Sequence, residues 1–81
     1  MFFTYILFSV SNNEYYTGHT NSVDIRFGKH NAGEVISTKH GMPWTLITAF
    51  KFETRSEAMR VEKKIKKRGI KRYLQDIQFG A

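Results

Sequence analysis

The feature that most constrains the fold is an apolar run near the start of the chain. Residues 2–9 read FFTYILFS and consist almost entirely of aromatic and branched side chains. Such a run predicts a β-strand that is buried on both of its faces. It is too short to cross a bilayer and is preceded by no basic segment. We therefore interpret it as a strand of the core, in a protein expected to be cytoplasmic and not bound to a membrane.

The rest of the chain predicts an α+β domain. The clearest helix start is the capping box at 54–57, which is followed by the apolar residues Ala58, Val61 and Ile65 at helical spacing. Residues 34–43 are predicted to form an exposed loop. The predicted strands are 2–9, 15–19 and 44–53, and the predicted helices are 22–31, 54–68 and 71–77. The order β-β-α-β-α-α indicates a three-stranded antiparallel sheet flanked by helices, within a single domain at 1–81.

In the third predicted strand, simple alternation assigns side chains to two faces. Leu46, Thr48, Phe50 and Phe52 are predicted to point one way, and the residues between them the other.

The charge of the chain favours a polyanionic partner. Thirteen Lys and Arg residues stand against seven acidic ones, giving a net charge of +6, and seven basic residues fall within positions 63–72. Such an excess is typical of nucleic-acid binding, although it can also serve only to keep a protein soluble. There is no Cys, which excludes disulfides and thiolate metal sites. The candidate nucleic-acid contacts are Lys39, His40, Lys63, Lys66, Lys67 and Arg68.

Three groups of residues are candidates for chemistry. Arg26 and His30 lie four apart in a predicted helix and share a face, which suits an Arg clamp on phosphate oxygens beside a proton-carrying imidazole. The alternative is a solvated pair on the helix surface.

Glu62 is predicted to lie at the rim of the apolar face of its helix. From there a carboxylate can serve as an oxygen ligand for a hard metal ion such as Mg²⁺. The alternative is an ion pair with Lys66, four residues later.

Tyr5 and Tyr16 lie on two strands that a hairpin would bring side by side. They are either core aromatics or phenols that orient or deprotonate a water molecule. Because a free phenol has a pKa of about 10, the second role needs a nearby cation.

In order and spacing, these residues resemble the GIY-YIG nuclease family over nearly the whole chain. The first signature appears as TYI at 4–6 and the second as YTG at 16–18. Arg26 and His30 follow the end of the second signature by eight and twelve residues. The segment 57–66, EAMRVEKKIK, looks like the family's metal-binding helix. The likeness is greatest to short, stand-alone bacterial members.

The resemblance implies an endonuclease that hydrolyses DNA phosphodiester bonds with one divalent ion. Glu62 would hold Mg²⁺ or Mn²⁺, and Arg26 would neutralise charge on the phosphate. Tyr5 or Tyr16 would orient or activate the water, with His30 assisting proton movement.

The alternative is a nucleic-acid-binding module that keeps the scaffold without cleavage. Larger members often carry an Asn after the metal-binding helix, and none follows Glu62 here. DNA is the expected partner ahead of RNA. Specificity would come from residues 34–43, the basic helix, a homodimer or a partner protein. DNA repair, recombination and defence are all compatible with such an activity.

Overall fold

The computed structural model describes residues 1–79, and within them three strands form one antiparallel sheet in the order β2-β1-β3. The strands are β1 (Phe2–Ser9), β2 (Glu14–Thr20) and β3 (Trp44–Phe52). The apolar run is therefore the central strand, as its burial on both faces requires. The predicted α+β fold is confirmed.

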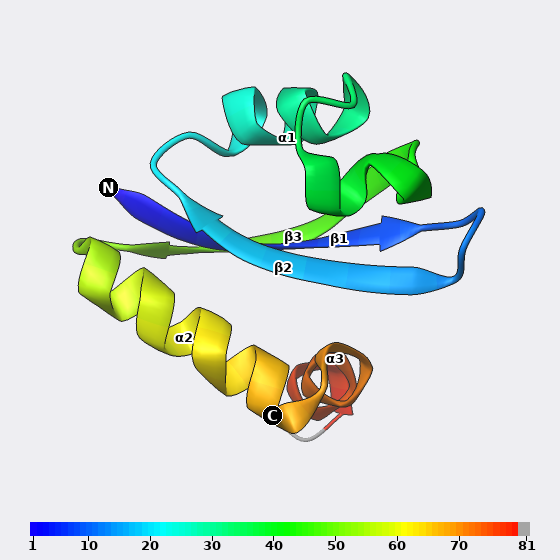
Figure 1. Ribbon diagram of the computed structural model, residues 1–81. Helices are drawn as coiled ribbons and strands as arrows, with labels where there is room; N and C mark the ends of the chain where they lie inside the picture. The colour runs from blue at the N-terminus through cyan, green and yellow to red at the C-terminus, as the bar shows by residue number, and fades with distance from the viewer. Residues whose placement is uncertain (80–81) are drawn as a thin grey trace.

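Helices cover both faces of this sheet (Figure 1). α1 (Val23–Asn31) and a short 3₁₀ helix, η1 (Ile36–Gly41), lie on one face. α2 (Arg55–Arg68) and α3 (Ile70–Phe79) lie on the other. Within residues 1–79, every helix is too short or too polar to span a lipid bilayer.

The predicted capping box starts α2. The hydroxyl of Thr54 accepts a hydrogen bond from the N–H of Glu57 at 3.2 Å, and the Glu57 carboxylate accepts one from the N–H of Thr54 at 3.2 Å. Ala58 and Ile65 are fully buried against the sheet. Gly69, with φ of 95°, ends the helix in a conformation that favours glycine.

The prediction of an exposed loop at 34–43 is wrong in part, because most of these residues are exposed but the segment contains a 3₁₀ helix. Residues 36–41 form η1, in which Thr38 and Gly41 are buried. Trp44 holds this segment against the sheet, because its indole Nε1 donates to the carbonyl of Thr38 at 2.8 Å. A Cβ atom at Gly41 would lie 2.4 Å from the Trp44 ring, so only glycine fits beneath it.

The predicted alternation along β3 holds for Thr48, Phe50 and Phe52 but is wrong for Leu46, because a β-bulge interrupts it. Ile6 of β1 pairs with Thr48, whereas the next residue, Leu7, pairs with Leu46, which leaves Ile47 without an opposite residue. Paired residues point to the same face and Ile6 and Leu7 point to opposite faces, so Leu46 and Thr48 also lie on opposite faces. The bulge therefore places Trp44 and Leu46 on the face of the sheet that α1 covers.

Each face of the sheet has its own core. On the α1 face, Tyr5, Leu7 and Trp44 are buried together, and half-buried Tyr16 and Phe27 pack against them. Tyr5 is thus both a core residue and a candidate site residue.

On the α2 face, Ile6 is buried, as are Ala58 and Ile65 of α2. Phe50 of β3 meets Tyr73 of α3 edge to face, with ring centroids 6.2 Å apart. The two faces therefore differ in chemistry as well as in the helices that cover them.

Candidate active site

The hydroxyl of Tyr5 is the centre of the site on the α1 face. It lies 2.9 Å from Nε2 of His30, and Nε of Arg26 donates a long hydrogen bond to it at 3.5 Å. Tyr5 is 1% exposed and His30 is 0% exposed. The central strand and one face of α1 thus bring three of the predicted site residues together.

The hydrogen bonds of His30 fix its tautomer. Its Nδ1 lies 2.7 Å from the hydroxyl of Thr38, and that hydroxyl donates its own proton to the carbonyl of Val35 at 3.3 Å. The Thr38 oxygen must therefore accept from Nδ1–H, which leaves Nε2 with a lone pair. It follows that the Tyr5 hydroxyl donates to Nε2 of His30.

Burial keeps both of these groups uncharged at neutral pH. It raises the pKa of Tyr5 to about 12, although the hydrogen bond from Arg26 acts in the opposite direction. It lowers the pKa of His30 to about 4, and the positive charge of Arg26 lowers it further. The pKa of Arg26 itself is raised, chiefly by its hydrogen bond to Tyr5. The cluster therefore carries one positive charge, on Arg26.

Gly18 makes room for this arrangement. It lies opposite Tyr5 in the pairing of β1 with β2. A Cβ atom there would come within 2.6 Å of the Tyr5 hydroxyl and 3.3 Å of the Tyr16 ring. The Tyr16 ring packs against His30 with centroids 5.1 Å apart, and it is only half-buried. Of the two tyrosines, Tyr16 is therefore the one closer to solvent.

Glu62 lies on α2, at the other face of the sheet. Its Oε1 is 2.6 Å from Nδ1 of His19, and its Oε2 is 2.7 Å from Nζ of Lys66. The side chain is 17% exposed. Burial raises the pKa of Glu62, but the hydrogen bonds from Lys66 and His19 outweigh it and leave the pKa below its usual value. Glu62 is therefore an ionised carboxylate at neutral pH.

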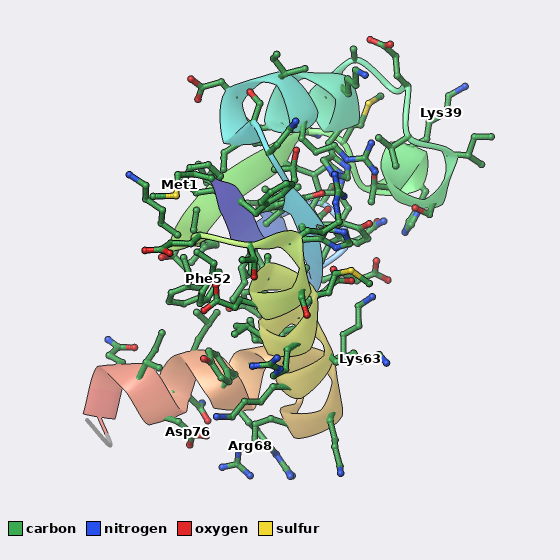
Figure 2. The ribbon with its side chains drawn as sticks, turned by 90° about the vertical axis from the view of Figure 1, so that its left-hand side faces the viewer. Met1, Lys39, Phe52, Lys63, Arg68 and Asp76 are labelled. Atoms are coloured by element: carbon green, nitrogen blue, oxygen red, sulfur yellow. The ribbon has the colours of Figure 1, made fainter. Side chains whose placement is uncertain are left out.

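The two halves of the site meet around the edge strand β2. His19, which contacts Glu62, follows Gly18 and points to the α2 face, whereas Tyr16 and Gly18 point to the α1 face. The two halves are electrostatically coupled, since the negative charge of Glu62 contributes to the raised pKa of Tyr5. Figure 2 shows Lys39 of η1 and Lys63 of α2 on one side of the molecule, above and below the sheet.

Glu62 is the carboxylate of this site that could hold a hard cation, with water and substrate as the other ligands. Within residues 1–79 no three His, Asp or Glu side chains gather into a metal-binding cluster. Mg²⁺, however, is commonly bound through one or two carboxylates together with water and substrate phosphates. Each carboxylate oxygen has two lone pairs, so the contacts with His19 and Lys66 leave Glu62 with acceptor capacity.

Residues 1–73 match the GIY-YIG catalytic domain. The chain belongs to the GIY-YIG family. It is 46% identical over 66 residues to a UPF0213 protein of Listeria monocytogenes, covering 80% of this chain and 73% of the relative. It is 44% identical over 57 residues to a UPF0213 protein of Halobacterium salinarum, covering 69% of this chain and 74% of the relative.

A solved structure shows the same fold. The solution NMR structure of a UPF0213 protein from Bacillus halodurans superposes with a TM-score of 0.57 at 31% identity, and the match covers 96% of this chain and 84% of that one. The predicted membership of the GIY-YIG family is thus confirmed. The chain therefore has the fold of the GIY-YIG catalytic domain.

In this GIY-YIG domain, half of the candidate nucleic-acid contacts already have a carboxylate partner. These pairs are His40 with Glu14 at 3.1 Å, Lys66 with Glu62 at 2.7 Å, and Arg68 with Asp76 at 2.7 Å. Lys39, Lys63 and Lys67 are exposed and make no ion pair within the described part of the chain. These three are the candidates whose charge is free for phosphate.

Two residues of the site were not predicted from sequence. His19 lies three positions after Tyr16, so strand alternation places it on the opposite face. That alternation, together with the rim position of Glu62, could have indicated that His19 lies beside Glu62. Thr38 lay in the predicted loop, where no local pattern pointed to it.

Proposed function

We propose that this GIY-YIG domain hydrolyses DNA phosphodiester bonds with one divalent metal ion, Mg²⁺ or Mn²⁺. The observation that carries the proposal is the contact of the Tyr5 hydroxyl with both His30 and Arg26. A cation, a phenol and a neutral imidazole are thereby held together on a rigid strand and helix. The ionised carboxylate of Glu62 lies around the edge of the same sheet.

Arg26 supplies charge to the phosphate. A guanidinium has five N–H donors, so the bond from Nε to Tyr5 leaves others for phosphate oxygens. Such a donor is most effective where negative charge develops in the transition state. Tyr5 holds this guanidinium in place, because Tyr5 itself is buried on the central strand.

The two tyrosines have different roles in this proposal. Tyr5 is almost inaccessible and has a pKa of about 12, so it is a poor base for a water molecule. Its hydroxyl instead accepts the hydrogen bond that orients Arg26, and it donates a hydrogen bond to Nε2 of His30. Tyr16 is half-buried beside them, and its hydroxyl is the one we assign to orient the attacking water.

Glu62 is the residue that would hold the metal ion. A divalent ion bound there would stabilise the negative charge of the scissile phosphate and of the leaving oxygen. His19 fixes the carboxylate from β2, and Lys66 fixes it from the next turn of α2.

Cleavage assays with Glu62→Gln test the proposal. The purified protein is incubated with supercoiled, single-stranded and branched DNA, and with duplex RNA, in Mg²⁺, Mn²⁺ or EDTA. Wild type should cut DNA only with a metal ion, and Glu62→Gln should not cut. The matched control is Glu53→Gln, which removes an exposed carboxylate from the β3–α2 turn and should cut like wild type. Equal cutting by Glu62→Gln and wild type would show that Glu62 is not the metal ligand.

The second candidate function is nucleic-acid binding without cleavage. The observation in its favour is that both Glu62 oxygens already have a cationic or imidazole partner. It predicts salt-sensitive DNA binding by wild type and by Glu62→Gln alike, with no cutting in any metal ion. The assay above separates the two functions, because only the first requires a metal-dependent product.

A further inference from the structure

A basic groove of about 460 Å³ lies on the outward face of α2. It is lined by Arg55, Ser56, Met59, Arg60 and Lys63. Three of the five residues are cations and none is acidic. Within residues 1–79, none of the three cations makes an ion pair. The groove is therefore a concentration of uncompensated positive charge.

The groove and Glu62 lie on neighbouring sides of the same helix. At ~100° per residue, Arg55 lies two turns before Glu62 and within about 20° of it around the helix axis. Lys63, the other end of the groove, directly follows Glu62. Figure 2 shows Lys63 pointing outward from α2, on the side opposite to the direction in which α3 extends. The groove as a whole faces about 90° away from Glu62 around the helix axis, on the solvent side of α2.

The groove is also partly ordered before any ligand binds. The guanidinium of Arg55 lies over the ring of Phe2, 4.8 Å from its centroid, in a cation–π contact. This contact restricts the Arg55 side chain and so lowers the entropy lost when it binds an anion. Met59, which is 43% exposed, supplies an apolar surface between the cations. A chain of phosphates with apolar sugars between them matches this alternation.

We propose that the groove binds backbone phosphates of the DNA substrate. The inference rests on the proposed nuclease function, and it names a surface of the protein that contacts the substrate. Arg55 and Lys63 are eight residues apart, or about 12 Å along the helix axis. Phosphates of one strand recur at about 3.4 Å along the axis of a DNA duplex, so the three cations can meet about three phosphates.

This assignment moves the DNA contact toward the start of α2. The basic run at 63–72 predicts nucleic-acid contacts at the C-terminal end of the helix. There, however, Arg68 makes two hydrogen bonds to Asp76, at 2.7 and 3.0 Å, and Lys66 is engaged by Glu62, so that of these neighbours only Lys67 makes no ion pair within the described residues. Arg55 and Arg60 are exposed and have no such partner within the described residues.

The salt dependence of binding in EDTA tests the groove without requiring catalysis. The groove variant is Arg55→Ala, Arg60→Ala, Lys63→Ala. The control variant is Lys29→Ala, Lys51→Ala, Arg72→Ala, which removes the same charge from exposed positions on α1, β3 and α3. Affinity for a short fluorescent duplex is measured across salt concentrations, and thermal melting followed by circular dichroism verifies that each variant is folded.

Each phosphate contact contributes about 0.9 to the slope of log affinity against log salt, so the groove variant should lose about 2.7 of the wild-type slope. The control variant should lose less than about one third of that amount. The single variants Arg55→Gln, Arg60→Gln and Lys63→Gln should each lose about 0.9, which keeps the test valid if the triple variant does not fold.

The outcomes separate this inference from the proposed function. Equal slopes for the groove and control variants would overturn the groove, while metal-dependent cleavage by wild type would keep the nuclease. A lost slope without any cleavage would support the groove and overturn the nuclease. No DNA binding at low salt would overturn both. Groove-dependent capture on phosphatidylserine vesicles with unchanged DNA slopes would show that the groove serves a lipid surface.

Discussion

The two faces of the sheet are held together by different interactions. On the α1 face, buried polar atoms are hydrogen-bonded in a chain from Tyr5 through His30 to Thr38. On the α2 face, the interior is formed by aliphatic side chains such as Ile6 and Ile65. Hydrogen bonds are directional and apolar contacts are not. The first face therefore fixes the positions of particular atoms, whereas the second mainly supplies stability.

Trp44 shows how tightly the α1 face is specified. Its main-chain N–H donates to the Asn31 side chain at 2.6 Å, its carbonyl accepts from the same amide at 3.0 Å, and its indole donates to Thr38. One residue thus links β3, α1 and η1. On the α2 face, two side-chain contacts join the sheet to α2 within the described residues. The Thr4 hydroxyl donates to the carbonyl of Ala58 at 2.7 Å, and Nδ1 of His19 lies 2.6 Å from Oε1 of Glu62.

The largest expected difference between the two faces is in the cleavage rate. Arg26→Ala should lower the cleavage rate by about 100- to 1000-fold, the usual loss when one donor to the transition state is removed. Ile65→Val, on the other face, should leave the rate within a few-fold and cost about 1 kcal/mol of unfolding free energy. Cleavage rates and urea unfolding of both variants check this. Similar rate losses for the two would show that the faces are not functionally distinct.

The next effect is a pH dependence of stability that originates on the α1 face. The pKa of His30 is lowered from 6.5 to about 4, chiefly by burial, so the unfolded chain binds a proton that the folded protein does not. Stability should therefore be complete above pH 6.5 and should fall as the pH decreases, by about 3 kcal/mol near pH 4. Urea unfolding across this pH range measures the loss. His30→Gln should flatten the profile, and an equally steep profile in that variant would assign the loss elsewhere.

A pair of glycines tests the packing around Trp44. Gly41→Ala should destabilise the protein by about 1–3 kcal/mol, because the new methyl would overlap the buried ring. Gly28→Ala is the matched control in α1, where nothing lies within 4 Å of the added methyl. It should stabilise the protein by about 0.5–1 kcal/mol through helix propensity. Thermal melting of the two variants gives the signs, and a neutral Gly41→Ala would mean that η1 can shift freely.

The smallest expected effect lies on the α2 face. Thr54→Ala removes the hydroxyl that caps α2 and should cost about 1 kcal/mol of unfolding free energy. Ser56→Ala, two residues later and exposed, should change stability by less than about 0.5 kcal/mol. Urea unfolding compares them. Equal losses would mean that the capping bond contributes nothing particular.

The features predicted correctly from sequence are those with local causes. The strand at 2–9 followed from an apolar run, and the start of α2 followed from side chains within one turn of each other. η1 and the bulge at Ile47 have tertiary causes instead. They depend on how Trp44 meets Thr38 and on how β3 pairs with β1, neither of which any short window of sequence contains.

The residues of the candidate site also divide into those with a local signal in the sequence and those without one. Spacing along one helix placed Arg26 beside His30, and the family signatures indicated Tyr5. The position of Glu62 at the rim of its helix was also predicted, and its ion pair with Lys66, considered as an alternative, is present. His19 was missed, because its role arises only when α2 packs against the edge strand.

The most direct test of the account is whether Arg26 and Glu62, on opposite faces, act on one phosphate. Single-turnover cleavage of supercoiled DNA in Mg²⁺ is measured for wild type, Arg26→Ala, Glu62→Gln and the double variant. If both residues serve one transition state, the double variant should lose much less than the product of the two single losses. Losses that multiply in full, or wild-type cleavage that continues in EDTA, would contradict a single metal-dependent site formed around β2.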